Sequence, residues 1–518
     1  MKFSISTNKG EENTELNRAN IPNEVSRVTE TLETAGFEAF LVGGCVRDLI
    51  LSKNPKDWDV TTNATPDQII SLFNKTFYEN DFGTVGVIFE NISDESLLRQ
   101  SATSQPASAT STSMVVEVTP YRLESTYSDN RHPDKVTFSQ QIEDDLKRRD
   151  FTINALAYSV SKKNVVDLYK GQEDIKDKII RTVGNPVARF REDGLRILRA
   201  VRFSCELQFK ISPETEKAIL EYGHLLKNIS SERIRDEFSK MIMSDKPLEG
   251  MLTLKKLGLL QYITPELEKT IGVEQNKAHA YDVWEHLLSS LQHAADQKLN
   301  LDMRLSALFH DISKPETRRW GKDTWTFYGH EVVGARVTKK ILNELKYPSK
   351  IVDKGVTMVR WHMFFSDTEQ ITLSAVRRMI ANVGKENIWD LMNLRICDRI
   401  GTGRPKANPY RLRKYRSMVE EALRDPVSVA MLKIDGKKVM NVTHVTPGPK
   451  IGYVLNALLE EVLEDPKKNT EEYLENRAKE LILLPENELK TLGDSGKQIK
   501  EEADEAEIKK IRSKHWVK

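Results

Sequence analysis

The sequence predicts an α+β protein whose N-terminal part holds a mixed β-sheet and whose remainder is all-α. Two segments near the N-terminus, residues 84–89 and 114–118, are rich in β-branched residues. Beyond residue 180, by contrast, the informative segments carry apolar residues at helical spacing. A chain of 518 residues exceeds what one hydrophobic core usually serves, so about two to four domains are expected.

The composition excludes several classes of protein. The net charge is +1, from 78 basic and 77 acidic residues, so any affinity for nucleic acid must come from local patches. Cys45, Cys205 and Cys397 are scattered without metal-binding or disulfide spacing, which is typical of core positions in a reducing compartment. The first twenty residues are polar and no apolar run approaches the ~20 residues of a membrane span. We therefore expect a cytoplasmic protein without membrane contact.

The first predicted element is an amphipathic helix over residues 21–35, which leads into a short apolar strand at residues 39–42. The strand stops at Gly43 and Gly44, where a second helix should begin. Two glycines at a strand-to-helix turn let a phosphate approach backbone N–H groups. Arg47 lies one helical turn further on and can meet the same anion.

An acid pair follows this turn. Asp57 and Asp59 flank Trp58, and in an extended strand residues two apart point to one face, so both carboxylates can hold the same hard cation. Each feature alone is common in proteins. A phosphate cradle followed, after a helix-length segment, by a magnesium-binding acid pair is nevertheless what nucleotidyl transfer requires.

The next segment predicts a helix, two strands and an insertion. Thr65 is a good helix N-cap and Pro66 suits the first turn. Residues 93–113 are of low complexity, and we expect a disordered insertion without a catalytic role. Glu117 lies mid-strand among valines, where a carboxylate is costly unless it faces water or binds metal. Both readings of Glu117 remain open at this point.

Residues 142–158 begin charged and end apolar. Arg148, Arg149 and Asp150 precede an apolar face that predicts a helix, which Asp150 can cap while an arginine faces outward. A plain charged helix start is the alternative.

Residues 189–202 predict a helix with a recognition pair. On one helix, Asp193 and Arg196 are neighbours and can present a carboxylate beside a guanidinium. The Watson–Crick edges of C and A both offer an amino donor and a ring-nitrogen acceptor, which such a pair complements. An ordinary surface ion pair is the alternative.

Four motifs resemble those of the class II tRNA nucleotidyltransferases and the related bacterial poly(A) polymerases, within the polymerase-beta superfamily: GGCVRD, DWD, RRDFTINALAY and EDGLRILRAVRF. The resemblance is close over residues 30–245 and looser to about residue 480. It implies that Glu117 is a third catalytic acid and that the nucleotide is bound by Gly43, Gly44, Arg47, Arg149, Asp150 and Asn154. It also implies that the base is read by Asp193, Arg196, Arg199 and Arg202.

From residue 276 onward the chain resembles an HD-type metal-dependent phosphohydrolase. Imidazole and carboxylate ligands suit a divalent transition metal, and His310 and Asp311 inside an apolar helix would be costly to bury unless ligated. Ser313 replaces the usual glycine after HDI, which leaves the ligands intact but brings the activity into question. The positions that match are His286, His310, Asp311, His330, His362 and Asp398.

The C-terminal part contains a basic stretch, residues 404–416, with interleaved tyrosines that suit RNA contact; a solvated helix start explains it equally well. The predicted division is a disordered N-terminus (1–20), a nucleotidyltransferase head (21–180), a helical neck (181–275), an HD domain (276–402), a helical tRNA-binding tail (403–485) and a charged C-terminal extension (486–518).

Together these features predict template-independent addition of CCA to tRNA 3′ ends from CTP and ATP, with Mg²⁺ on Asp57 and Asp59. The HD residues predict an additional phosphohydrolase with a divalent transition metal. The alternatives are a poly(A) polymerase or an enzyme that adds only A or only CC, and, in another class, an HD phosphohydrolase whose head only binds nucleotide. A non-catalytic RNA-binding module would be expected to lack the acids. No protein partner is implied.

Overall fold

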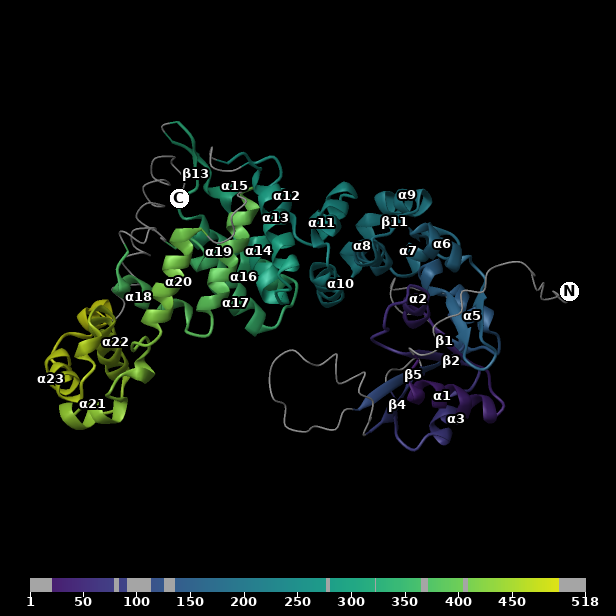
Figure 1. Ribbon diagram of the computed structural model, residues 1–518, viewed down its shortest axis with the longest axis horizontal. Coiled ribbons are helices and arrows are strands. Elements are labelled where there is room, and N and C mark those ends of the chain that lie inside the picture. The colour runs from purple at the N-terminus through teal and green to yellow at the C-terminus, as the bar shows by residue number, and fades with distance from the viewer. Residues whose placement is uncertain are drawn as a thin grey trace. The chain divides into compact units, whose positions relative to one another are not determined.

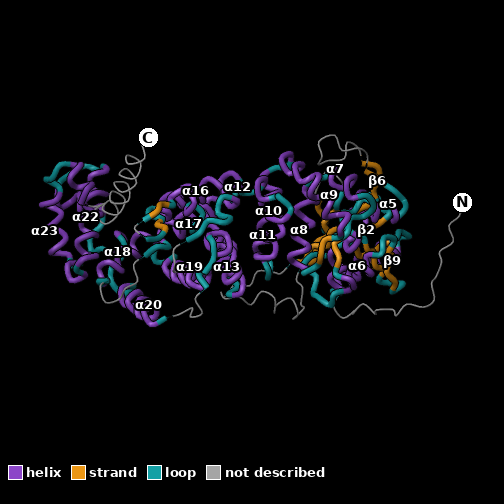
Figure 2. Tube along the Cα trace, turned by 90° about the horizontal axis from the view of Figure 1, so that it is seen from above, coloured by secondary structure: helices purple, strands orange, loops and turns teal. Residues whose placement is uncertain are grey.

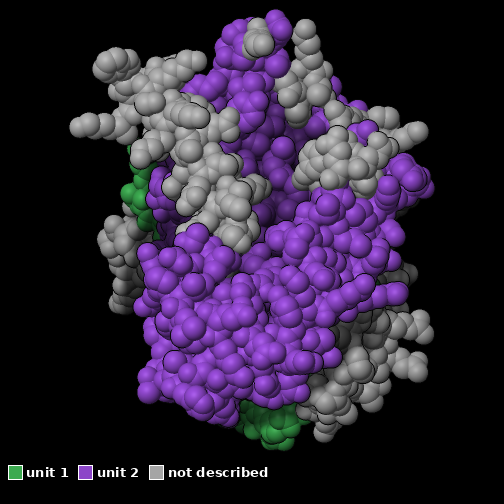
Figure 3. Space-filling model, turned by 90° about the vertical axis from the view of Figure 1, so that its left-hand side faces the viewer, with its two compact units in different colours: residues 1–230 green, residues 231–518 purple. Residues whose placement is uncertain are grey.

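The computed structural model describes residues 21–78, 83–90, 113–124, 136–275, 280–321, 323–364, 371–403 and 409–492. The predicted N-terminal segment 1–20, nearly all of the insertion 93–113 and most of the C-terminal extension lie outside these ranges. The chain divides into two compact units, residues 1–230 and 231–518, which Figure 3 distinguishes by colour. The boundary falls within the predicted neck, and the finer division remains a prediction.

Unit 1 is built on a seven-stranded sheet with the strand order β3-β4-β5-β2-β1-β8-β9. β2 and β5 are parallel, and the other neighbouring pairs are antiparallel, so the predicted mixed sheet is confirmed. Figure 2 shows the strands in orange. The strands are β1 (Ala39–Val42), β2 (Asp59–Thr62), β3 (Thr76–Tyr78), β4 (Val85–Phe89), β5 (Met114–Pro120), β8 (Leu156–Ser159) and β9 (Asn164–Asp167).

The predicted N-terminal helix is α1, Asn23–Thr34, and its buried residues include Val25, Val28 and Leu32. It packs on β1, whose four residues are all buried. The predicted helix start at Thr65 is also confirmed, because Thr65 and Gln68 form a capping box. The helices of unit 1 are α1, α2 (Gly44–Ile50), α3 (Pro66–Leu72), α5 (Ile142–Lys147), α6 (Gly171–Asp177), α7 (Pro186–Glu192), α8 (Leu195–Leu207) and α9 (Pro213–Tyr222).

The helix predicted after Asp150 is wrong. Residues 152–154 form a single 3₁₀ turn, and the chain then enters β8, which pairs with β1 and β9. Every residue from Phe151 to Ser159 is buried. An apolar run that is buried throughout has no alternating pattern, so periodicity cannot distinguish such a strand from a buried helix.

The single helix predicted over residues 189–202 is also wrong. α7 ends at Glu192, Asp193 is extended, and α8 begins at Leu195. A Cβ on Gly194 would lie 3.1 Å from the Cβ of Leu225, so the backbone passes too close to its neighbour for a larger residue to fit without adjustment. The chain therefore changes direction at Asp193 and Gly194.

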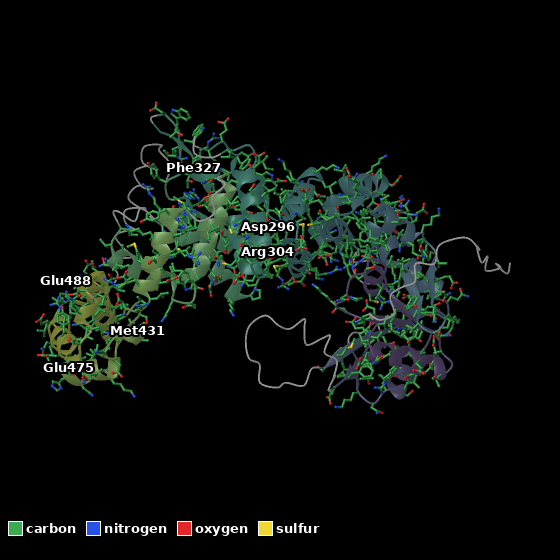
Figure 4. All side chains as sticks on the ribbon, viewed as in Figure 1. Asp296, Arg304, Phe327, Met431, Glu475 and Glu488 are labelled. Atoms are coloured by element: carbon green, nitrogen blue, oxygen red, sulfur yellow. The ribbon has the colours of Figure 1, made fainter. Side chains whose placement is uncertain are left out.

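The described residues of unit 2 are almost entirely helical (Figure 1), as predicted, and contain one short strand pair, β12 (Arg319–Trp320) and β13 (Trp325–Thr326). Buried Arg304, labelled in Figure 4, ties α14 to α10 by donating to the carbonyls of Ile242 and Ser244 at 2.9 and 2.7 Å. The longer helices are α10 (Ser231–Met243), α11 (Pro247–Lys256), α13 (Val283–Asp296), α14 (Leu301–Phe309), α16 (His330–Glu344), α17 (Ser349–Trp361), α18 (Leu373–Val383), α19 (Ile388–Gly401), α20 (Tyr410–Ala422), α21 (Gly436–Thr443), α22 (Pro449–Glu464) and α23 (Glu471–Leu481).

Within the described ranges, we find no helix with the length and apolar character needed to cross a membrane.

Candidate functional sites

The predicted acids lie at the centre of the unit 1 sheet. β2 and β5 pair in parallel with Asp59 directly beside Glu117, and both residues are half-buried. Asp57 is exposed and lies in a bend before β2, and Trp58 between the two acids is buried, so the expectation that both acids lie in one extended strand holds for Asp59 alone. The ligand groups that converge within 4.8 Å among the described residues all belong to unit 2, so these three acids do not form a closed metal cage.

An open arrangement of acids still fits Mg²⁺. This ion usually keeps several waters and is held by one or two carboxylates together with substrate phosphates, and not by an all-protein cage. Asp57 and Asp59, with Glu117 on the neighbouring strand, supply oxygen donors of the kind that Mg²⁺ prefers.

Gly43 occupies the turn between β1 and α2, as predicted, with a φ of +79° that favours glycine. A Cβ there would lie 2.9 Å from Arg149 Nη1 and 3.7 Å from Asp59 Oδ2. The bare backbone, the guanidinium and the carboxylate therefore meet at one point. Asp145 holds Arg149 at 2.9 Å, and Arg149 Nε is buried without a hydrogen-bond partner among the described residues.

A chain of polar contacts lies behind this turn. Arg47 Nη1 donates to Asn154 at 2.8 Å, Asn154 Nδ2 donates to Asp150 at 3.2 Å, and Arg199 Nε donates to Asp150 at 2.8 Å. Burial alone would raise the pKa of Asp150, but the charges of Arg199 and Arg196 lower it to about 2. Asp150 is therefore ionised at neutral pH, and it holds Arg199 in place and does not cap a helix.

The predicted base-reading residues lie at the junction of α7 and α8. The carboxylate of Asp193 accepts a hydrogen bond from Leu195 N at 3.0 Å, which satisfies a free N–H at the start of α8. Arg196 Nη1 lies 2.5 Å from Glu192 Oε2, and its Nη2 donates to the carbonyl of Arg148 at 3.0 Å. Arg202 binds Glu206 at 2.8 Å on the same helix.

The predicted HD residues come together in unit 2. His286 lies on α13, His330 begins α16 and Asp398 lies on α19. The expectation that His310 and Asp311 lie inside a helix is wrong, because both follow the end of α14, and His362 likewise follows the end of α17. The six residues form two groups that could each hold a metal ion: His286, His310, Asp311 and Asp398, and Asp311, His330 and His362.

Asp311 belongs to both groups. Its Oδ2 lies 3.0 Å from His286 Nε2, and its Oδ1 lies 3.1 Å from His330 Nε2 and 3.4 Å from His362 Nε2. One carboxylate therefore faces both sets of imidazoles with different oxygens, an arrangement that fits a bridging ligand.

The histidines are oriented by the backbone. The Nδ1 atoms of His310, His330 and His362 contact carbonyl oxygens at 2.9, 2.7 and 2.7 Å, which leaves each Nε2 directed at the cluster. Burial lowers the pKa of His362, which favours the neutral imidazole that binds metal. For His310, burial is outweighed by the carboxylates of Asp311 and Asp398, which raise its pKa, so a metal ion that binds His310 has to displace a proton.

Ser313 is buried behind the cluster, and its hydroxyl has no hydrogen-bond partner among the described residues. The six predicted ligand residues, four histidines and two aspartates, gather in this cluster. Such a set of imidazole and carboxylate donors fits a transition metal.

Three protein-family models match successive segments of the chain. The model of the Poly A polymerase head domain matches residues 39–181, that of the probable RNA and SrmB-binding site of polymerase A matches residues 208–271, and that of the HD domain matches residues 283–388. A CCA-adding enzyme of Ligilactobacillus salivarius (strain UCC118) is 31% identical over 89% of this chain and 98% of its own length. The chain belongs to the CCA-adding enzyme family.

Two further relatives show the breadth of this family. An A-adding tRNA nucleotidyltransferase of Deinococcus radiodurans is 34% identical over 63% of this chain and 76% of its own length. The crystal structure of the Bacillus stearothermophilus CCA-adding enzyme in complex with CTP superposes with a TM-score of 0.62 and 25% identity, and covers 88% of this chain and 96% of that one. The prediction of a nucleotidyltransferase with an α+β head and helical remainder is thereby confirmed.

The sequence of this member of the CCA-adding enzyme family did not lead us to predict a role for Phe203 at the nucleotide site. Its ring is buried, and the guanidinium carbons of Arg47, Arg199 and Arg202 lie 5.2, 5.3 and 4.0 Å from the ring centroid. Cation–π contact with one ring holds three predicted nucleotide-binding arginines together. The sequence feature that could have predicted this contact is the spacing of Phe203, which lies one turn after Arg199 on the same face of α8.

The basic stretch near residue 404 is only partly suited to RNA. Residues 404–408 lie outside the described ranges. Tyr410 is exposed at the start of α20 and can stack on a base, whereas Tyr415 is buried and packs against Phe364 with ring centroids 4.8 Å apart. The expectation of interleaved stacking tyrosines is therefore wrong for Tyr415, which faces the core at helical spacing.

Proposed function

We propose that this chain adds CCA to tRNA 3′ ends from CTP and ATP. The observation that carries the proposal is the meeting of Gly43, Arg149 and Asp59 at one turn, with Glu117 on the strand beside Asp59. A phosphate-binding turn next to carboxylates that can hold Mg²⁺ suits transfer from a nucleoside triphosphate. Membership of the CCA-adding enzyme family supports tRNA as the acceptor, and action on tRNA supports the predicted cytoplasmic location.

In the proposed reaction, the RNA 3′-hydroxyl attacks the α-phosphorus of the nucleotide in line, and pyrophosphate leaves. Mg²⁺ on Asp57 and Asp59 would lower the pKa of the hydroxyl and neutralise charge on the triphosphate. Arg149, whose Nη1 faces the turn at Gly43, binds the triphosphate together with the backbone of that turn. Asp150 and Asn154 hold Arg199 and Arg47 beside the nucleotide.

Glu117→Gln should lower kcat for CMP addition by about two orders of magnitude, because the amide cannot supply the negative charge beside Asp59. The KM for CTP should change little, since the triphosphate contacts are intact. Asp67→Asn, which removes an exposed acid in the first turn of α3, is the matched control. Equal kcat values for wild type and Glu117→Gln would show that Glu117 is a solvent-facing strand residue without a role in catalysis.

Asp193→Ala should narrow the preference for CTP over UTP by about one to two orders of magnitude, the worth of one charge-assisted hydrogen bond. Because the Asp193 carboxylate also accepts from Leu195 N, the loss of this cap must be separated from base reading. Asp193→Asn keeps an acceptor for Leu195 N while changing the group that faces the base. The measurement is kcat/KM for CTP, ATP, UTP and GTP; an unchanged preference in both variants would place base selection elsewhere.

Addition of A alone is a second candidate, because the Deinococcus radiodurans relative carries the name of an A-adding enzyme. The discriminating experiment supplies each labelled nucleoside triphosphate separately to tRNA lacking CCA, to tRNA ending in CC and to a single-stranded RNA. CCA addition requires CMP incorporation on the first acceptor and AMP on the second. A poly(A) polymerase would extend all three acceptors with AMP.

We also propose that the six-residue cluster in unit 2 is a phosphohydrolase centre. The observation that supports it is that Asp311 belongs to both ligand groups, so that the six residues would hold divalent transition metal at one cluster. Such ions supply a metal-activated water and stabilise charge on the phosphoryl group. Hydrolysis of phosphomonoesters or 2′,3′-cyclic phosphates should require added Mn²⁺, Ni²⁺ or Co²⁺ and proceed independently of nucleotide addition.

A further inference from the structure

A short hairpin is anchored to the metal-ligand cluster at both of its ends. It leaves from α15 (Lys314–Thr317), where Lys314 Nζ lies 2.6 Å from Asp311 Oδ2, and returns at Phe327, whose carbonyl contacts His330 Nδ1 at 2.7 Å. Lys314 Nζ also lies 5.4 Å from the centroid of the Phe327 ring, which closes the base of the hairpin. Phe327 is labelled in Figure 4.

The strands of this hairpin carry two tryptophans. Trp320 and Trp325 are cross-strand partners with ring centroids 4.8 Å apart and an interplanar angle of 82°. Edge-to-face packing of this kind stabilises a two-stranded hairpin, which explains why Trp325 is an aromatic residue. This packing does not explain why a ring as large as that of Trp320 is left 64% exposed to solvent.

One basic side chain, Arg318, packs on the tryptophan pair. The guanidinium of Arg318 lies 3.7 Å from the centroid of the Trp325 ring, and its Nε is buried without a hydrogen-bond partner among the described residues. The carboxylate of Glu274, which is itself highly exposed, lies 3.5 Å from Arg318. A long contact with a solvated carboxylate is weak, so a phosphate group could replace it.

The chain geometry keeps these residues close to the cluster. Trp325 precedes Phe327 by two residues, so their Cα atoms are at most about 7 Å apart. Phe327 in turn contacts His330 of the cluster. A ligand whose phosphate reaches the cluster can therefore extend toward the tryptophan pair.

We propose that this hairpin binds the nucleobase of the phosphate ester that the cluster hydrolyses, with the base stacked on Trp320. The inference rests on the proposed phosphohydrolase and narrows its substrate class to nucleoside phosphates, either free or at an RNA 3′ end. Exposed aromatic rings beside arginine and lysine are the combination that binds unpaired nucleotides without requiring a particular base. Arg318 contacts the phosphate.

The kinetic test compares adenosine 3′-monophosphate with β-glycerophosphate, a monoester without a base, in the presence of Mn²⁺. Trp320→Ala should raise KM for adenosine 3′-monophosphate about tenfold, since loss of one stacking contact weakens binding to that extent, and should leave KM for β-glycerophosphate unchanged. Trp320→Phe should restore most of the difference. Tyr78→Ala, which removes a 54% exposed aromatic side chain from unit 1, should change neither.

A second test measures binding without hydrolysis. We expect 8-azidoadenosine 3′-phosphate to label the peptide containing Trp320 and Trp325 in the full-length protein, and unlabelled adenosine 3′-monophosphate to compete where β-glycerophosphate does not. A single-stranded RNA with a 3′-phosphate that competes at lower concentration than the mononucleotide would identify an RNA end as the source of the ligand. The reverse order would identify the free nucleotide.

The outcomes separate the two proposals. If neither ester is hydrolysed with Mn²⁺, Ni²⁺ or Co²⁺, the phosphohydrolase proposal fails. Photolabelling alone then tests whether the hairpin binds a nucleobase. If both esters are hydrolysed with KM values that Trp320→Ala does not change, or if the hairpin peptide is not labelled, the hairpin is a structural element and the inference is overturned.

Discussion

Asp59→Asn should reduce CMP and AMP addition by about 10³-fold or more, because the variant loses a metal-binding charge worth several kcal/mol in the transition state. Asp59 is half-buried at the first position of β2, beside Glu117 and next to Gly43 and Arg149. Asparagine keeps the shape of the side chain, so the melting temperature should change by only a few degrees. Single-turnover incorporation and thermal unfolding of the same preparations measure both quantities.

Asp57→Asn should show a similar loss, since Asp57 is exposed two residues before Asp59 and would hold the same metal ion. The loss should apply to every nucleotide, in contrast to the selectivity change expected for Asp193→Ala. Near-normal incorporation by either variant, with the protein folded, would remove that acid from the metal site.

Asp311→Asn should abolish metal-dependent hydrolysis, with a loss of at least about 10²-fold, because the neutral amide is a far weaker ligand for a cation. Asp311 is buried and faces both ligand groups, so bound Mn²⁺ should fall for the whole cluster and not for one group alone. Addition by unit 1 should stay within a few fold of wild type. Metal content after dialysis, phosphatase activity and CMP incorporation test the three statements.

The control for this prediction is Asp302→Asn, which changes an acid in the first turn of α14 that lies outside the cluster. Because Asp311 also lies close to Lys314 at 2.6 Å, its replacement can affect folding. Wild-type protein treated with a chelator supplies an independent arm: it should lose hydrolysis and regain it with Mn²⁺. Full phosphatase activity in the chelated protein would contradict a metal centre.

Local chemistry made part of the structure predictable. A double glycine after an apolar strand predicts a turn because few other residues accept a φ of +79°, and Gly43 adopts that value. The acid pair was predicted only in part: Asp59 begins β2 beside Glu117, whereas Asp57 lies in a bend before the strand, so the face-sharing argument does not apply to it. The resemblance of the HD segment supplied the ligand set, and the structure places all six residues within two adjoining groups.

The features that sequence reasoning missed depend on contacts between distant segments. β8 is buried on both faces, so its residues lack the alternation that would distinguish a strand from a helix. The break at Asp193 occurs beside Gly194, which packs closely against Leu225, and no local pattern reports that contact. Phe203 gains its role only when Arg47 is brought to α8 by the fold.

The most direct test of the central claim is the mass of the product formed from one tRNA that ends at the nucleotide before CCA. The tRNA is incubated with the full-length protein, Mg²⁺ and all four nucleoside triphosphates, and intact product is analysed by mass spectrometry. The account predicts a single product extended by two CMP and one AMP. An increment of one AMP, of two CMP alone, or of a ladder of AMP would contradict it.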